Sequence, residues 1–146
     1  MNKELIKIKE TIIGSFPCIY PYKFIDDITF LNDEKIIGTY LYKEDEFFYS
    51  GHFKGNPITP GAILLETMAQ IGLLAFGSFL VRNKVDKNFF LTSSDVKFLK
   101  VVKPKDLVIV MSKKIFFRHG KLKCSVVMKN QNKETISTGV LSGMLI

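Results

Sequence analysis

The sequence predicts an α+β domain, and three features of the 146-residue chain indicate this class. Two β-rich runs come first, one long apolar helix follows, and four further β-rich runs occupy the second half of the chain. Helix and strands are therefore segregated along the chain, as is typical of α+β proteins. The length and the 47% hydrophobic content are sufficient for one core, so we expect residues 1–146 to form a single domain.

The expected elements follow the distribution of apolar and turn-forming residues. Apolar residues of mixed period near the N-terminus predict one or two helical turns that end before Pro17. The polar residues 32–34 separate two β-rich runs and predict a hairpin. The expected strands are 27–31, 35–42, 88–99, 106–117, 121–129 and 134–144, with turns at 103–105, 119–120 and 130–132.

The most informative stretch is a Gly/Pro-rich loop that leads directly into the apolar helix. Three glycines and two prolines within residues 51–61 exclude regular structure before the helix and fix a tightly turned path. Thr59 and Pro60 suit the N-cap and the first position of a helix of about 20 residues. Because this helix is apolar nearly all round, we expect it to be buried on most faces. Gly72 and Gly77 within it indicate that the sheet packs closely against it.

One histidine and one carboxylate make this stretch a candidate active site. His52 lies in the loop, and Glu66 lies among apolar residues of the helix. A carboxylate in such surroundings is costly to ionise, so we expect a raised pKa, which suits a general acid. Gln70 lies one turn further on the same helix face and is placed to orient Glu66. Taken singly, either residue is more often structural, and the spacing leaves open whether they meet within one chain or across a dimer interface.

Motifs along nearly the whole chain match one family pattern in the right order. They comprise residues 46–48, 51–53, Gly55, Pro57, Pro60-Gly61, Glu66 and 68–70, then Tyr20-Pro21-Tyr22 with Ile25-Asp26, and Val96-Lys97-Phe98 with Val102, Pro104 and Asp106. This pattern resembles the FabZ-type β-hydroxyacyl-[acyl-carrier-protein] dehydratases. The chain departs from the family pattern at Cys18, Asp27, Lys54, Thr59, Thr67 and Leu99-Lys100.

The resemblance implies a hot-dog fold, in which a curved antiparallel sheet wraps around a long central helix. It implies a hydro-lyase, a (3R)-3-hydroxyacyl-[acyl-carrier-protein] dehydratase that eliminates water to give the trans-2-enoyl thioester in fatty-acid biosynthesis. The departures keep open a specialised enzyme for a secondary lipid or a polyene. In the family the histidine and the glutamate meet across a homodimer interface, so we expect a homodimer, with a trimer of dimers as a further possibility.

Dehydration needs a base for the α-proton, an acid for the departing hydroxyl and hydrogen-bond donors for the thioester oxygen. We assign His52 as the base and Glu66 as the acid. The backbone N–H of Gly61, at a helix N-terminus, is the candidate donor to the thioester oxygen. The expected substrate-binding residues are completed by Phe53, Gln70 and Phe98.

Two other functions use the same residues. A hot-dog thioesterase would activate water at Glu66 and release a free acid, although the His52 loop argues against it. A non-catalytic acyl-binding partner in a biosynthetic complex would need no contact between the two residues. Product analysis separates the first alternative from a dehydratase, because only hydrolysis releases the carrier thiol.

The charge balance favours an acidic partner. The chain has 21 basic and 14 acidic residues, a net charge of +7. Acyl carrier protein, which is acidic, fits the resemblance, and we expect it to dock on Lys97, Lys100 and Lys103. Nucleic acid and an anionic membrane are the other possibilities. We do not expect nucleic acid, because the lysines are scattered along the sequence and no binding motif appears.

No cofactor, metal or membrane is expected from the sequence. Cys18 and Cys124 form no C-x-x-C pair, and no cluster has the spacing of metal ligands. The substrate would instead be carried on the phosphopantetheine arm of acyl carrier protein. The N-terminus is too charged for a secretory signal, and no later segment lacks polar residues over the length of a membrane span. We therefore expect a cytoplasmic protein.

Overall fold

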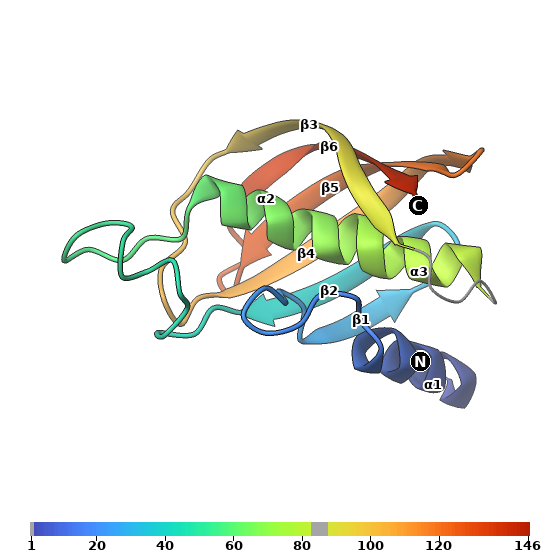
Figure 1. Ribbon diagram of the computed structural model, residues 1–146, viewed down its shortest axis with the longest axis horizontal. Coiled ribbons are helices and arrows are strands. Elements are labelled where there is room, and N and C mark those ends of the chain that lie inside the picture. The colour runs from blue at the N-terminus through green and yellow to red at the C-terminus, as the bar shows by residue number, and fades with distance from the viewer. Residues whose placement is uncertain (1, 83–87) are drawn as a thin grey trace.

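The computed structural model describes residues 2–82 and 88–146 and contains one sheet with a long helix across it (Figure 1). The helices are α1 (Lys3–Gly14), α2 (Gly61–Ala69), the π-helix η1 (Gln70–Ala75) and α3 (Phe76–Val81). The strands are β1 (Asp27–Leu31), β2 (Lys35–Leu41), β3 (Phe89–Phe98), β4 (Leu107–Arg118), β5 (Lys121–Asn130) and β6 (Thr135–Leu145). The α+β class and the hot-dog arrangement are confirmed, and each expected strand is present with its ends shifted by one residue at most.

The six strands form one antiparallel sheet in the order β1-β2-β4-β5-β6-β3. The three hairpins β1-β2, β4-β5 and β5-β6 join sequence neighbours, whereas β3 crosses over to the far edge beside β6. β3 is therefore an edge strand, and most of its side chains are exposed. This places the segment that contains Phe98 at the border of the sheet, close to the start of the long helix.

The helices α2, η1 and α3 follow one another without a break, and residues 61–81 appear as one helix in Figure 1. The sheet approaches this helix closely at glycines. A Cβ on Gly38 would lie 2.7 Å from Ile71, and a Cβ on Gly72 would lie 3.1 Å from Ser112. The Ser112 hydroxyl donates a 3.0 Å hydrogen bond to the Gly72 carbonyl, inside the π-helical segment. The expected close packing against the helix is thus confirmed.

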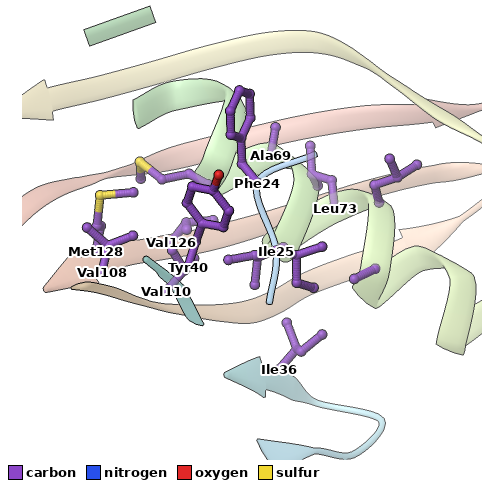
Figure 2. Packing of buried hydrophobic residues seen from close by; sticks show 14 of the residues in the cluster. Phe24, Ile25, Ile36, Tyr40, Ala69, Leu73, Val108, Val110, Val126 and Met128 are labelled. Atoms are coloured by element: carbon purple, nitrogen blue, oxygen red, sulfur yellow. The ribbon is translucent and has the colours of Figure 1, made fainter. Parts of the chain in front are cut away.

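The hydrophobic core lies between this helix and the sheet. Figure 2 shows Ala69 and Leu73 of the helix in one layer with Val108, Val110 and Val126 of the central strands. The strand residues alternate between buried and more exposed positions, as a sheet covered on one face requires. Residues 61–81 are long and apolar enough to cross a membrane, but 78% of their most apolar window is buried inside the protein. This is the core helix of the fold.

Two local expectations were wrong. The N-terminal segment forms a 12-residue helix rather than one or two turns, because Asn2 caps it through Leu5 N–H and its apolar face packs on the core. Thr59 does not cap α2. Its hydroxyl is buried in a 2.6 Å hydrogen bond with the Tyr49 hydroxyl, so Pro60 takes the N-cap position and Gly61 begins the helix.

Gly139 offers a test of how tightly β3 is held to β6. A Cβ at this position would collide with the backbone carbonyl of Asp95, which cannot rotate away. We expect Gly139→Ala to lower the free energy of unfolding by about 1–3 kcal/mol, measured by urea denaturation. Gly51→Ala is the matched control, since a Cβ there meets open space. Equal stability of the two variants would contradict this account of the β3-β6 contact.

Candidate active site

Glu66 is held in place by the side-chain amide of Gln70, whose nitrogen and oxygen both form hydrogen bonds. Gln70, only 1% exposed, donates from its Nε2 to Glu66 Oε2 at 2.9 Å and to the Tyr22 carbonyl at 3.0 Å. Its Oε1 accepts a 2.7 Å hydrogen bond from the Phe24 N–H. A backbone N–H can only donate and a carbonyl can only accept, so these partners fix which end of the amide faces Glu66. The expectation that Gln70 orients Glu66 is confirmed.

The surroundings of Glu66 favour its protonated form. The side chain is half-buried, and burial raises the pKa of Glu66 above its usual value while the Gln70 hydrogen bond acts in the opposite direction. The expected raised pKa is therefore confirmed, with loss of hydration as its main cause. Tyr22 and Cys18 face the same carboxyl, and the pKa of each is raised first by burial and then by the charge of Glu66.

His52 lies in a loop that is closed by its own hydrogen bonds. Ile58 N–H donates to the His52 carbonyl at 2.9 Å, while Phe53 and Asn56 exchange a pair of backbone hydrogen bonds. The imidazole Nδ1 lies 2.8 Å from the Ile58 carbonyl oxygen. Because that oxygen can only accept, Nδ1 carries the proton and Nε2 keeps a free lone pair in the neutral ring. The Phe53 ring stacks on the imidazole at a centroid distance of 3.8 Å.

No hydrogen bond joins His52 to Glu66 within the part of the chain that the structure describes. The loop extends beyond the end of the sheet, away from the body of the fold (Figure 1). Glu66, by contrast, lies one turn into the long helix, against the segment 22–24. Within a single chain the imidazole and the carboxyl are thus each held by other partners and not by one another.

The start of α2 offers free backbone donors. The N–H groups of Gly61 and Ala62 have no acceptor among residues 2–82 and 88–146, as is usual for a first helical turn. The Phe98 ring covers this turn, because a Cβ on Gly61 would lie 3.6 Å from it. Phe98 is itself 47% exposed, and Phe53 is 52% exposed. The expected substrate-binding residues Gly61, Phe98 and Gln70 therefore surround the Glu66 end of the helix, whereas Phe53 stays with His52.

The three lysines expected to dock the carrier protein are all exposed. Lys97 lies on β3, and Lys100 and Lys103 follow it in the connection to β4. Lys100 is engaged in an ion pair with Glu134, which lowers the pKa of that carboxyl. No group of three metal-ligating side chains occurs in the described ranges.

Sequence reasoning missed the segment 22–24, whose backbone holds the Gln70 amide against Glu66. We call this set of hydrogen bonds the clamp. The backbone of residues 22–24 holds Gln70, and Cys18 and Tyr22 lie near enough to Glu66 to feel its charge, whereas in the sequence this segment counted only toward the family resemblance. The turn around Tyr20-Pro21-Tyr22 was the available signal, because a fixed turn that precedes a strand can present backbone groups to a helix.

Comparison with known proteins identifies the family of the chain. The family model described as "FabA-like domain" matches residues 17–136. The 3-hydroxyacyl-[acyl-carrier-protein] dehydratase FabZ of Syntrophobacter fumaroxidans is 39% identical over 111 residues, which cover 75% of this chain and 74% of that protein. FabZ of Caldicellulosiruptor saccharolyticus is 32% identical over 124 residues, with 83% and 88% covered.

Among solved structures, the dehydratase heterocomplex ApeI:P from Xenorhabdus doucetiae has a TM-score of 0.75 to this chain. The two share 13% sequence identity, and the match covers 89% of this chain and 87% of the other, so it supports the fold alone. The sequence identity to the FabZ enzymes and the length of the matched domain are sufficient to assign the chain to a family. The chain belongs to the FabZ-type dehydratase family, with a FabA-like domain of the hot-dog fold.

Proposed function

We propose that the chain is a (3R)-3-hydroxyacyl-[acyl-carrier-protein] dehydratase, which eliminates water to give the trans-2-enoyl thioester. The observation that carries this proposal is Glu66, a half-buried carboxyl with a raised pKa and one oxygen held by Gln70. A raised pKa favours the protonated form, from which this carboxyl can deliver a proton to a departing hydroxyl. Membership of a dehydratase family supports the same reaction.

The clamp selects the oxygen of Glu66 that carries the proton. Glu66 Oε2 accepts from Gln70, whose amide cannot turn round without losing its bonds to Phe24 and Tyr22. An oxygen that accepts this hydrogen bond is the poorer site for a proton, so the acidic hydrogen occupies Oε1. Gln70 is therefore a positioning residue: it presents the proton on the oxygen that faces away from the clamp.

His52 is the base. With Nδ1 donating to the Ile58 carbonyl, Nε2 is free to take the α-proton of the substrate. The electrons of that C–H bond form the new double bond, Glu66 Oε1 gives its proton to the 3-hydroxyl, and the C3–O bond breaks to release water. The N–H of Gly61 would donate to the thioester oxygen while negative charge develops there.

The active unit is a homodimer in which His52 of the partner subunit approaches Glu66. Two observations support this. The exposed edge of β3 has unpaired backbone groups, which a second copy can satisfy by antiparallel pairing. Large apolar side chains are also exposed near the site, as expected for an interface. They are Ile19, Tyr20, Phe47, Phe53, Phe98, Leu99 and Val101.

The substrate would arrive on the phosphopantetheine arm of acyl carrier protein, and no further cofactor is needed for the elimination. The lysines 97, 100 and 103 stand beside Phe98, which covers the first turn of α2. An acidic carrier docked on them would bring its thioester to that turn. The enzyme would act in the cytoplasm, where this pathway and its carrier are found in the family.

We expect His52→Ala and Glu66→Gln each to lower kcat by about a hundred- to ten-thousand-fold, because each removes one proton-transfer group.

Mixing the two inactive variants tests the dimer. Half of the randomly mixed dimers pair intact His52 with intact Glu66 at one of two sites, so activity should return to about a quarter of the wild-type value.

Both variants must first show the circular dichroism and melting temperature of the wild type. Near-normal turnover in either variant would contradict the assignment of acid and base. Inactivity of the mixture, with subunit exchange demonstrated by mass spectrometry, would contradict the shared site while leaving the two roles intact.

Gln70→Met should raise the pKa of Glu66, because it keeps the length of the side chain but removes the donor that stabilises the carboxylate. The pKa can be followed from the carboxyl carbon of Glu66 by ¹³C NMR, without any turnover. In kinetics, the alkaline fall in kcat should move to higher pH, since Glu66 must be protonated to act. Gln131→Met, at an exposed glutamine far along the chain, is the control. An unchanged pKa in Gln70→Met would refute the clamp.

Carrier docking predicts that Lys100→Glu combined with Lys103→Glu raises KM for the carrier-bound substrate at least about tenfold. The same variant should process a short pantetheine thioester normally, because that substrate lacks the acidic protein. Lys3→Glu with Lys7→Glu changes the net charge equally on α1 and serves as the control. An unaltered KM for the carrier-bound substrate would rule this docking site out.

A further inference from the structure

Basic residues that are scattered in the sequence gather on one face of the sheet. On β5, Leu122, Cys124, Val126 and Met128 point to the core, so the intervening residues point to the opposite face. The pairing of β2 and β4 with β5 extends this outward face across the centre of the sheet. The basic face, as we call it, comprises Lys35, Lys113, Arg118, Lys121, Lys123 and Lys129.

The strand register places these charges side by side. Lys35 lies directly opposite Lys113, and Arg118 lies directly opposite Lys121. On this face the acidic residues lie only on the two edge strands, Asp27 on β1 and Asp95 on β3, and none lies on β2, β4, β5 or β6. Like charges directly opposite each other on neighbouring strands are unfavourable, so folding alone does not account for this arrangement.

None of these basic residues forms an ion pair with another residue that the structure describes. The six ion pairs among the described residues involve Lys9, Lys43, Arg82, Lys100, Lys105 and Lys114, none of which belongs to the basic face. The long helix packs on the opposite side of the sheet, and the main contacts of α1 are with β1 and α3. The basic face is therefore left uncovered by the helices that the structure describes.

Apolar side chains lie between the charges. Ile37, Met111 and Val127 are consecutive cross-strand partners that form a half-buried stripe beside the row containing Lys35 and Lys113. Ile115, in the β4 bulge, is 51% exposed, and Met144, opposite Lys121, is 37% exposed. Lysines with exposed aliphatic groups among them match a surface that offers both negative charge and hydrocarbon.

Among anionic partners, an anionic lipid surface fits these features best. A second copy of the chain would bring two like-charged faces together, which excludes self-association through this face. Single-stranded nucleic acid is bound through exposed aromatic rings, but the ring of Phe116 is covered by Arg118 at 4.5 Å. Lysine clusters with aliphatic neighbours are the pattern that attracts proteins to anionic headgroups.

We propose that the basic face binds peripherally to anionic lipid membranes, on the side of the sheet opposite Glu66. Such binding would hold a dehydratase next to the membrane for which acyl chains are made, while the carrier docks at the β3 edge of the sheet. Peripheral binding of this kind is compatible with a cytoplasmic enzyme. Only the tips of the side chains would meet the lipid headgroups, and no part of the chain would insert into the membrane. The proposal does not depend on the dehydratase assignment.

Co-sedimentation with vesicles tests the proposal. The wild-type protein should pellet with vesicles of phosphatidylglycerol and phosphatidylcholine, fail to pellet with pure phosphatidylcholine, and be released by salt. Lys113→Glu with Lys121→Glu should weaken the binding about thirty-fold or more. Lys3→Glu with Lys7→Glu, which changes the net charge by the same amount on exposed residues of α1, should bind nearly as the wild type does.

Loss of binding confined to the basic-face variant would support the proposal. Absence of vesicle binding by the wild type, or equal loss in both variants, would overturn it. Tighter binding to a single-stranded oligonucleotide than to vesicles would assign the face to nucleic acid instead. Lys113→Gln with Lys121→Gln replaces the charge-reversed variant if that variant does not fold. Turnover of a soluble substrate should be unchanged throughout, so this test is independent of the proposed activity.

Discussion

The structure of the site depends on one buried amide. Gln70 connects two parts of the chain, the segment 22–24 and the long helix, because it accepts from Phe24 N–H, donates to the Tyr22 carbonyl and donates to Glu66. The Phe24 N–H is buried and the other two groups are partly buried, and a buried polar atom without a partner costs roughly 1–3 kcal/mol. The requirement to satisfy them all fixes the segment 22–24 against the helix and gives Glu66 a single orientation. The orientation of Glu66 and the packing of this segment thus rest on the same contacts.

Glu66 is partly desolvated because the helix that carries it packs closely against the sheet. Glycines on the strand and on the helix allow the two to approach closely, so the helix is covered by apolar side chains over most of its surface. Among the described residues, each buried side-chain nitrogen or oxygen atom has a hydrogen-bond partner. Thr67, for instance, donates to the Ile63 carbonyl and accepts from the Tyr42 hydroxyl at 2.5 Å. Glu66, at the border of the layer, is left partly desolvated.

The sequence predicted the fold well because the signals were periodic and local. Alternation in the strands, the turn residues and the apolar helix each act over a few residues, and the expected Glu66–Gln70 pair is a contact within one helical turn. The failures at the site involve partners beyond the reach of these local patterns. Thr59 bonds to Tyr49 instead of capping the helix, and the clamp from residues 22–24 lies more than 40 positions from Gln70. Spacing also cannot show where the His52 loop points, since that depends on the packing of a whole subunit.

The π-helical segment Gln70–Ala75 lets the two halves of the long helix be oriented independently, the first for Glu66 and the second for packing at Gly77. Each residue of an α-helix advances the direction of the side chain by about 100°, so an uninterrupted α-helix would tie the direction of Glu66 rigidly to that of Gly77, which abuts Phe89. A π-helical turn behaves as one inserted residue and resets this angular relation. The first half of the helix can therefore be oriented for chemistry and the second half for packing, with the Ser112 hydroxyl compensating the displaced backbone at Gly72.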